Sequence, residues 1–237
     1  MTLLELLQRA SDESGMGGRA VFTTAQSLTG RQADIVNWVK RAWRRLQNEH
    51  DDWFWMRGEY SGSVASDTRR YASSALGDAG LTSRFADWIF SPDERQPSGV
   101  TIYLTATGQT DERPLIWRDW DWFWRYRMTG EHALVSDYPV EFTISPGREI
   151  VLYPTPNDAY TLRGQFHRSP QELTLDSDEP EMPVRFHDLV WMGALHYWGT
   201  SAESLQQTAV WRADYNDLLA DLRRDQLPRI DTAQALA

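Results

Sequence analysis

The sequence predicts an α+β fold in which helices from both ends of the chain form one bundle and a mainly antiparallel, β-rich lobe lies between them. Apolar residues recur at helical intervals near both ends, whereas the middle of the chain alternates between apolar and polar positions. Glycine, proline, asparagine and aspartate separate the alternating runs, as turns between strands require. We therefore expect N-terminal bundle helices over residues 1–52, the β-rich lobe over 53–168, C-terminal bundle helices over 169–225 and a flexible tail over 226–237.

Two helices are expected before the lobe. Thr2 and Glu5 have the spacing of a capping box, which satisfies two free N–H groups at a helix start. The apolar positions of this first helix are Leu3, Leu6, Leu7 and Ala10. Thr29 and Gln32 repeat the start signal for a second helix. Its apolar stripe consists of Ile35, Val39, Ala42, Trp43 and Leu46.

Strands are expected in the lobe. Val100, Ile102 and Leu104 occupy alternate positions, and so do Val140, Phe142 and Ile144. After the second run, Pro146-Gly147 supplies a turn into 149–153, and residues 154–158 turn again into 160–166. These last runs predict a three-stranded antiparallel meander.

The C-terminal helices differ in how far they should be buried. Residues 186–198 are apolar on more than one helical face, so we expect this helix to be buried nearly all round. Gly199 is expected to end it, and Thr200 with Glu203 to cap the next helix. The apolar stripe of that last helix comprises Trp211, Tyr215, Leu218 and Leu222.

Composition excludes several classes of function. The chain has no cysteine, so disulfides, thiolate metal sites and cysteine nucleophiles are absent. No apolar run approaches the ~20 residues that cross a bilayer, and we expect no membrane contact. The formal net charge of −10 repels a polyanion on average, so specific DNA binding is not expected.

The search for reactive groups in the sequence is largely negative. The five histidines show no paired metal-ligand spacing, and no pair of carboxylates stands out for acid and base roles. An acidic run resembles a calcium loop but lacks its interior glycine and terminal glutamate, which favours a solvated turn: Asp176, Asp178, Glu179 and Glu181. We therefore expect no metal, no cofactor and no enzyme activity.

A basic edge on the second predicted helix is the one place where phosphate could be held. It consists of Lys40, Arg41, Arg44 and Arg45. Cations near the C-terminal end of a helix also suit the helix dipole, so solvation or pairing with an acidic partner is the favoured interpretation.

The tryptophan-rich segment has two interpretations. As a strand it would present Trp120, Trp122, Trp124 and Tyr126 on one face, where they could stack on sugars while Asp119 and Asp121 hold hydroxyl groups. As a helix it would place Trp117, Trp120 and Trp124 together as an anchor into a core or a neighbouring subunit. The helix interpretation is favoured, and it gives the candidates for a subunit interface: Trp117, Trp120, Trp122 and Trp124.

Two stretches carry a resemblance to a known family. The first runs from Ile35-Val36-Asn37-Trp38-Val39 through Trp53-Phe54-Trp55-Met56. The second runs from Glu149 to Pro156 and continues through Tyr160, Leu173, Asp176, Asp178, Glu179-Pro180, Met182-Pro183, Phe186-His187 and Ala194-Leu195. In order and spacing these elements resemble the head-to-tail adaptor (connector) family of tailed phages, the group that includes tail tubular protein A.

The resemblance implies a virion structural protein at the head-tail interface, assembled in the host cytoplasm. Copies would form a homo-oligomeric ring, commonly twelvefold, between the portal protein and the tail or nozzle protein, through which double-stranded DNA passes without specific binding. A C-terminal tail would dock on the portal, and the residues placed to do so are Gln226, Leu227, Pro228, Arg229, Ile230 and Leu236. Two alternatives stay open: a carbohydrate-binding module of a tail fibre or baseplate, and a hydrolase that uses two carboxylates in a cleft.

Overall fold

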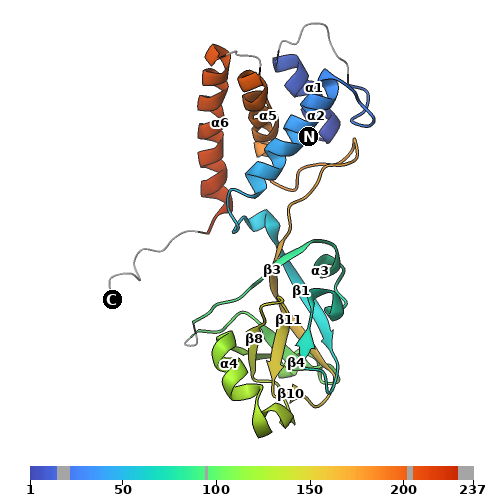
Figure 1. Ribbon diagram of the computed structural model, residues 1–237, viewed down its shortest axis with the longest axis vertical. Helices are drawn as coiled ribbons and strands as arrows, with labels where there is room; N and C mark the ends of the chain where they lie inside the picture. Colours follow the sequence, from blue (N-terminus) through green and yellow to red (C-terminus); the bar gives the residue numbers. More distant parts are fainter. Residues whose placement is uncertain (15–21, 94–95, 202–204, 229–237) are drawn as a thin grey trace, which may run out of the picture. The chain divides into compact units, whose positions relative to one another are not determined.

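The chain divides into two compact units in the computed structural model, which describes residues 1–14, 22–93, 96–201 and 205–228 (Figure 1). The first unit, the helical unit, joins Met1–Met56 with the chain from Pro170 onward, and the second, the β unit, is Arg57–Ser169. Helices from both ends of the sequence make the first unit, and all the strands of the described residues lie in the second. The predicted α+β class is confirmed.

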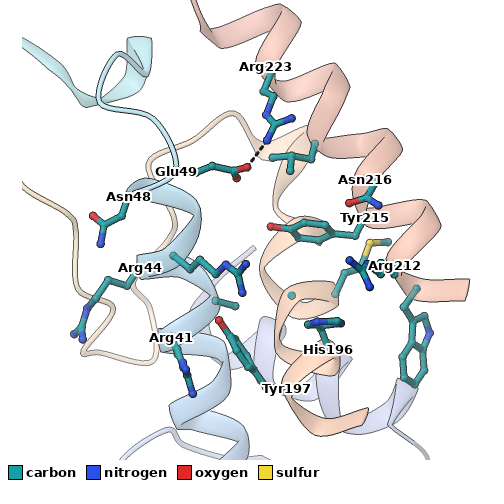
Figure 2. Close-up of a pocket in the computed structure, with 16 residues that line it drawn as sticks. Arg41, Arg44, Asn48, Glu49, His196, Tyr197, Arg212, Tyr215, Asn216 and Arg223 are labelled. Carbon is teal, nitrogen blue, oxygen red and sulfur yellow. Dashed lines mark hydrogen bonds and ion pairs between the residues drawn. The ribbon is translucent and has the colours of Figure 1, made fainter. Parts of the chain in front are cut away.

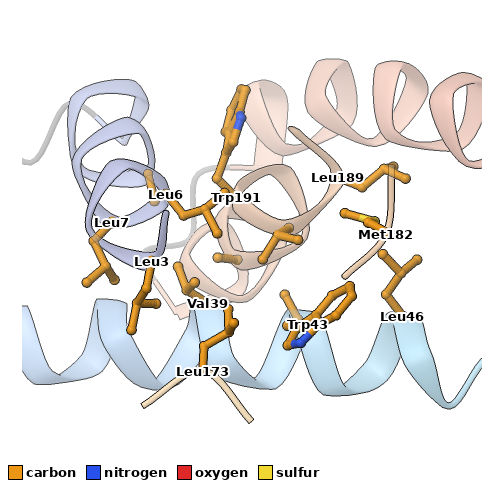
Figure 3. Packing of buried hydrophobic residues seen from close by; sticks show 14 of the residues in the cluster. Leu3, Leu6, Leu7, Val39, Trp43, Leu46, Leu173, Met182, Leu189 and Trp191 are labelled. Atoms are coloured by element: carbon orange, nitrogen blue, oxygen red, sulfur yellow. The ribbon is translucent and has the colours of Figure 1, made fainter. Parts of the chain in front are cut away.

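Four helices form the first unit. They are α1 (Leu3–Glu13), α2 (Arg31–Gln47), α5 (Asp188–Ser201) and α6 (Leu205–Gln226), with short 3-10 turns η1 (Phe54–Met56) and η5 (Val184–Phe186). Helix α5 packs against α1, α2 and α6 (Figure 1). Figure 3 shows apolar side chains of α1, α2 and α5 meeting Leu173 and Met182 from the connecting segment.

The start of α1 is as predicted. The Thr2 hydroxyl accepts from the Glu5 N–H at 3.3 Å, and the Glu5 carboxylate accepts from the Thr2 N–H at 2.9 Å. The predicted apolar stripe is buried at every position: Leu3, Leu6, Leu7 and Ala10. In addition, the Leu3 N–H donates to the carbonyl of Asp178 at 2.7 Å, which ties α1 to the segment before α5.

The start of α2 differs from the prediction. Gly30 is the N-cap, with φ 60° and ψ −140°, and no side chain caps the helix. Because this backbone conformation favours glycine, the chain turns into the helix at Arg31, and the predicted capping box of Thr29 and Gln32 is wrong. The apolar stripe is confirmed, because all five predicted residues are buried: Ile35, Val39, Ala42, Trp43 and Leu46.

Helix α5 is buried nearly all round, as its composition predicts; of residues 188–199 only Asp188 is exposed. Gly199 does not end the helix, which runs to Ser201. A glycine inside a helix costs only about 1 kcal/mol, and packing on all sides outweighs that cost. Thr200 therefore belongs to α5 and does not start the next helix, and Glu203, its predicted partner, lies outside the described residues.

Helix α6 places its predicted stripe against the bundle. Leu222 is buried, and Trp211, Tyr215 and Leu218 are partly buried against the same core. Leu219, which the stripe did not include, is also buried, at 6 % exposure. The stripe is confirmed and is one residue wider than predicted.

A five-stranded sheet forms one layer of the β unit. Its central strand is β11 (Tyr160–Arg168), which pairs antiparallel with β1 (Arg57–Val64) along one edge. Its other edge pairs with β4 (Thr101–Leu104) and then β3 (Phe85–Ile89), and β5 (Arg113–Pro114) follows β4. Gly164 lets the Tyr60 ring lie flat on β11, because a Cβ there would sit 2.8 Å from the tyrosine hydroxyl.

A second sheet has the order β2 (Arg70–Tyr71), β9 (Ile150–Tyr153), β8 (Glu141–Ile144) and β6 (Ile116–Trp117). The β8–β9 hairpin is the one predicted, but the third strand of the predicted meander is wrong, because β11 belongs to the other sheet. The short strand β10 (Thr155–Pro156) intervenes and pairs with β7 (Ser136–Asp137), so the chain leaves the hairpin before β11 begins.

Short helical elements complete the β unit: η2 (Ser73–Leu76), α3 (Ala79–Arg84), η3 (Gly108–Asp111), α4 (Trp120–Arg127) and η4 (Gly130–Leu134). The apolar core of this unit draws on both sheets. It includes Tyr60, Ile102, Phe142, Ile150, Leu162 and Phe166.

His187 makes the helical unit sensitive to acid. The side chain is 1 % exposed, and its Nε2 lies 3.0 Å from the carbonyl oxygen of Met182. Burial lowers the pKa of His187 below its usual value of 6.5, against the opposing effect of the hydrogen bond to Met182. In this pH range His187 is therefore protonated in the unfolded chain and neutral in the folded chain. Stability is lost as the pH falls below about 6.5.

We expect the free energy of unfolding to fall by up to about 1.4 kcal/mol per pH unit in that range because of this residue. His187→Gln keeps a donor for the Met182 carbonyl and removes the titration, so it should flatten the dependence. Urea unfolding of both proteins at pH values above and below 6.5 measures this. Equal slopes for the two proteins would show that His187 is not the cause.

Candidate interaction surfaces

The tryptophan-rich segment is a helix. Its start is capped by Asp119, whose carboxylate accepts from the N–H groups of Asp121 at 3.0 Å and Trp122 at 3.2 Å. The strand interpretation is wrong, because the helix spreads its aromatic side chains around its axis and Asp119 is engaged by the backbone. The flat sugar-stacking platform that a strand would form is therefore not present.

The four predicted interface tryptophans occupy different positions. Trp117 lies on β6, outside the helix, and stacks on Phe90 with the ring centroids 5.8 Å apart. Trp120 and Trp122 are partly buried and pack against the cluster of Val151 and Tyr153 on β9. Trp124 is 47 % exposed, next to Trp120 at 5.6 Å. Of the four, only Trp124 is exposed, and the other three are partly buried.

Phe123, which the sequence did not single out, anchors α4 to the sheet. Its side chain is 0 % exposed and meets the Tyr153 ring edge-on, with centroids 6.3 Å apart. The sequence favours the neighbouring tryptophans as contact residues because they are larger. The face that a helix buries depends instead on the strand beneath it.

A buried carboxylate fixes both ends of α4 to β8. Glu141 is 5 % exposed and accepts from Arg118 Nε at 3.0 Å and from Arg127 Nε at 2.7 Å. The hydrogen bond to Glu141 raises the pKa of Arg127. The Trp122 ring lies 5.1 Å from each guanidinium, which adds cation–π attraction to the two ion pairs. These contacts hold the exposed face of α4 in one orientation.

Exposed apolar side chains are concentrated around this helix. Of the nine large hydrophobic residues that are exposed in the described part of the chain, six come from residues 116–140: Ile116, Trp124, Tyr126, Leu134, Val135 and Val140. We call these six residues the apolar stretch. Two of them are adjacent in space, since the Ile116 N–H donates to the Val140 carbonyl at 3.0 Å. Exposed apolar side chains gathered in this way are typical of protein interaction sites.

One hollow of the β unit, of about 350 Å³, gathers carboxylates. Glu112 accepts from the Thr101 hydroxyl at 2.6 Å and from Arg163 at 3.3 Å, and Asp78 caps α3 through the Gly80 N–H at 2.8 Å. Glu59 is the third carboxylate. Two of the three carboxylates thus form hydrogen bonds within the β unit.

A groove of about 890 Å³ lies between α2, α5 and α6 (Figure 2). Its floor includes Gly193, where an added Cβ would lie 3.1 Å from the Ala42 side chain, so α5 and α2 approach closely there. Five arginines and one glutamate are among its lining residues: Arg41, Arg44, Arg45, Arg212, Arg223 and Glu49. The groove is therefore strongly cationic in a chain whose net charge is −10.

Tyr197 contacts two of these arginines, Arg41 and Arg45. The Arg41 guanidinium lies 4.5 Å from the centre of the Tyr197 ring. The Tyr197 hydroxyl oxygen accepts a hydrogen bond from Arg45, and this bond is the main cause that raises the pKa of Arg45. Burial raises the pKa of Tyr215, on the α6 side, to about 12, so this hydroxyl stays neutral. The groove thus keeps its positive charge at any physiological pH.

Two of the groove arginines have carboxylate partners. Arg44 pairs with Glu172 at 2.7 Å, and Arg223 pairs with Glu49 (Figure 2). Arg41, Arg45 and Arg212 form no close ion pair among the residues that the structure describes, and Glu49 also attracts Arg45, which contributes to its raised pKa. The sequence singled out Lys40, Arg41, Arg44 and Arg45, and the last three line the groove. It did not indicate the arginines of α6, since only folding brings α6 beside α2.

Two of the predicted portal-binding positions belong to the helical unit. Gln226 is the last residue of α6, and Leu227 packs against the bundle core with its N–H bonded to the Arg223 carbonyl at 3.1 Å. Pro228 is exposed. The remaining predicted positions lie outside the described residues: Arg229, Ile230 and Leu236.

Metal ligands do not cluster in the described residues, where no group of three or more His, Asp or Glu side chains could hold an ion. Within the same residues, no helix combines the length and the apolar character that spanning a bilayer requires.

We predict that Phe123→Ala lowers the free energy of unfolding by about 3–5 kcal/mol, because it leaves a cavity between α4 and the sheet. The matched control is Trp124→Ala on the same helix, whose larger ring is 47 % exposed and whose loss should cost less than about 1 kcal/mol. Urea unfolding followed by circular dichroism compares them. Similar losses for both variants would mean that α4 is not anchored through Phe123.

Comparison with known proteins assigns the chain to a family. The family model described as SU10 adaptor protein matches residues 1–235, nearly the whole chain. Among curated proteins, none matches the chain significantly. The family match confirms the resemblance that the two sequence stretches predicted. The chain belongs to the SU10 adaptor protein family, a family of phage head-tail adaptors.

Proposed function

We propose that the protein is a virion structural component that forms a closed ring between the portal protein and the tail or nozzle, where the ring is part of the DNA conduit. The observation that carries this proposal is the family match over residues 1–235. Twelvefold symmetry is the expected form of the ring, as in the adaptors that the sequence resembles. The role is one of binding between surfaces, and no covalent chemistry is part of it.

The apolar stretch supports the ring. Leu134 is 84 % exposed and Tyr126 55 %, values that leave large apolar areas in contact with water in an isolated subunit. Covering such side chains contributes roughly 25 cal/mol per Å² of apolar surface removed from water. The Glu141 contacts that fix α4 also reduce the ordering entropy lost on association, since the surface is held in place before it binds.

The charge balance supports the conduit. A chain with a formal net charge of −10 repels phosphates on average, and a ring of such chains lets DNA slide without being held. Strong DNA binding would require many uncompensated cations along the wall, and binding of that kind would hinder passage.

The test of the proposed function is assembly with the cognate portal. The full chain and the purified portal are mixed, and sedimentation velocity measures the mass of the complex. A complex whose mass corresponds to a ring of copies on one portal is expected. A chain that stays monomeric at high concentration and does not sediment with the portal would overturn the proposal.

Within this proposal, the apolar stretch is a contact surface of the assembled ring. Trp124→Ser and Leu134→Ser should each weaken assembly by about tenfold or more, because large side chains at the centre of an interface carry most of its binding free energy. Leu175→Ser is the matched control, since Leu175 is 60 % exposed but lies in the helical unit. Sedimentation of the three variants with the portal compares them; equal assembly of all three would remove the apolar stretch from the interface.

The segment 229–237 is proposed to bind the portal. Because Leu227 belongs to the bundle, the sharpest truncation removes residues 229–237 and leaves α6 intact. We expect at least about a tenfold loss of portal affinity, with the stability of the chain unchanged. A chain carrying a scrambled 229–237 segment is the control for composition. Full affinity of the truncated chain would exclude the tail as the portal-binding element.

A further inference from the structure

Helix α6 carries opposite charges on its two flanks. Arg212, Asn216 and Arg223 line the groove. At about 3.6 residues per turn, the aspartates of the helix fall on the side roughly opposite these groove residues. They are Asp214, Asp217, Asp221 and Asp225, and all four are exposed. One side of α6 is thus cationic and the other is acidic.

Part of the acidic flank is neutralised within the chain. Asp221 pairs with Arg224 and Asp225 pairs with Arg185, at the C-terminal end of α6. Asp214 and Asp217 have no basic partner among the described residues; we call these two the aspartate pair. In the groove, Arg41, Arg45 and Arg212 likewise form no close ion pair with a carboxylate in that part of the chain; we call these three the arginine triad.

The two sets cannot satisfy one another within one subunit. At about 100° per residue, Asp214 lies about 160° and Asp217 about 140° around the helix from Arg212, and neither aspartate lines the groove. Contact between them therefore requires a second copy of the chain. A contact that joins two different faces of identical subunits is heterologous, and its repetition closes a ring when the rotation allows it.

The groove is suited to receive carboxylates. Arg41 is held over the Tyr197 ring at 4.5 Å, and Arg45 is held near the Tyr197 hydroxyl, so these guanidinium groups are ordered before a partner arrives. Trp211 and Tyr215 line the same groove and give its α6 side an aromatic surface. Hydrogen bonds between guanidinium and carboxylate are about twice as strong as neutral ones, and a volume of about 890 Å³ accommodates the flank of an approaching helix.

We propose that the aspartate pair of one copy binds the arginine triad in the groove of the next copy, and that this contact sets the direction of the ring. The inference rests on the proposed ring and specifies which surfaces of the helical unit meet. A second copy fits the groove better than DNA does, because a long polyanion that enters it also approaches a chain of net charge −10.

The test uses charge reversal in the full chain. A groove variant carries Arg41→Glu and Arg212→Glu, and a flank variant carries Asp214→Arg and Asp217→Arg. The control carries Asp12→Arg and Glu13→Arg, two exposed acidic residues of α1 in the same unit, with the same change of charge as the flank variant. Circular dichroism checks that each folds, and sedimentation velocity measures assembly alone and with the portal.

Either reversed variant alone should assemble at least about tenfold more weakly than the wild type, because like charges then meet at every contact. The control should assemble normally. An equal mixture of groove and flank variants should regain assembly, because each reversed groove then meets a reversed flank and each unchanged groove meets an unchanged flank. The chain that carries all four substitutions should also regain it.

Normal assembly of both variants, or a loss that neither the mixture nor the fourfold variant restores, would overturn the inference. The inference would also be overturned if the wild type bound a short DNA duplex and the groove variant did not, while the groove variant still assembled normally. That result would assign the groove to phosphate binding. In all these cases a wild-type ring on the portal leaves the proposed function standing. Failure of the wild type itself to form a ring or bind the portal would defeat both.

Discussion

The burial of α5 on all sides is the constraint on which the helical unit depends. Leu189, Val190, Ala194 and Leu195 are each at most 2 % exposed, and α5 contacts α1, α2 and α6. Since a helix in this position leaves almost no room for charge, the charged residues of the bundle are confined to the outward flanks of its neighbours. The arginine-lined groove follows from this arrangement, with α5 as floor and α2 and α6 as walls.

The order of the elements along the chain places a constraint on the ends of the lobe. The bundle takes α1 and α2 from before the lobe and α5 and α6 from after it, so the lobe must begin and end close together. Strands β1 and β11 meet this condition, because they pair antiparallel with Arg57 opposite His167. The first and last strands of the lobe therefore stabilise one another, and an inserted sheet leaves the two halves of the bundle free to share one core.

Local periodicity predicted the parts of the fold that depend on local packing. The stripes of α1 and α2 and the all-round burial of α5 were correct, because a helix that buries one face or every face shows this in its own sequence. The start of α2 and the end of α5 were wrong, since a glycine with positive φ at residue 30 and packing around residue 199 outweighed the expected capping signals.

Long-range features were harder to predict. Tryptophans at every second position fit a strand as well as a helix, and the choice depends on Phe123 meeting β9, which is remote in sequence. Placement of β11 depends likewise on β1, about a hundred residues earlier. Of the arginines in the groove, only those of α2 could be predicted from the sequence. The contribution of Arg212 and Arg223 exists only once α6 has folded against α5.

In the proposed function, preformed surfaces on the bundle and on the sheet act by binding complementary surfaces of other subunits. Electron cryomicroscopy of the adaptor bound to its portal tests this most directly. The account predicts a closed ring in which neighbouring copies cover the groove between α2, α5 and α6 and a protein surface covers residues 116–140. Separate subunits on the portal, with the groove and that stretch both open to solvent, would contradict it.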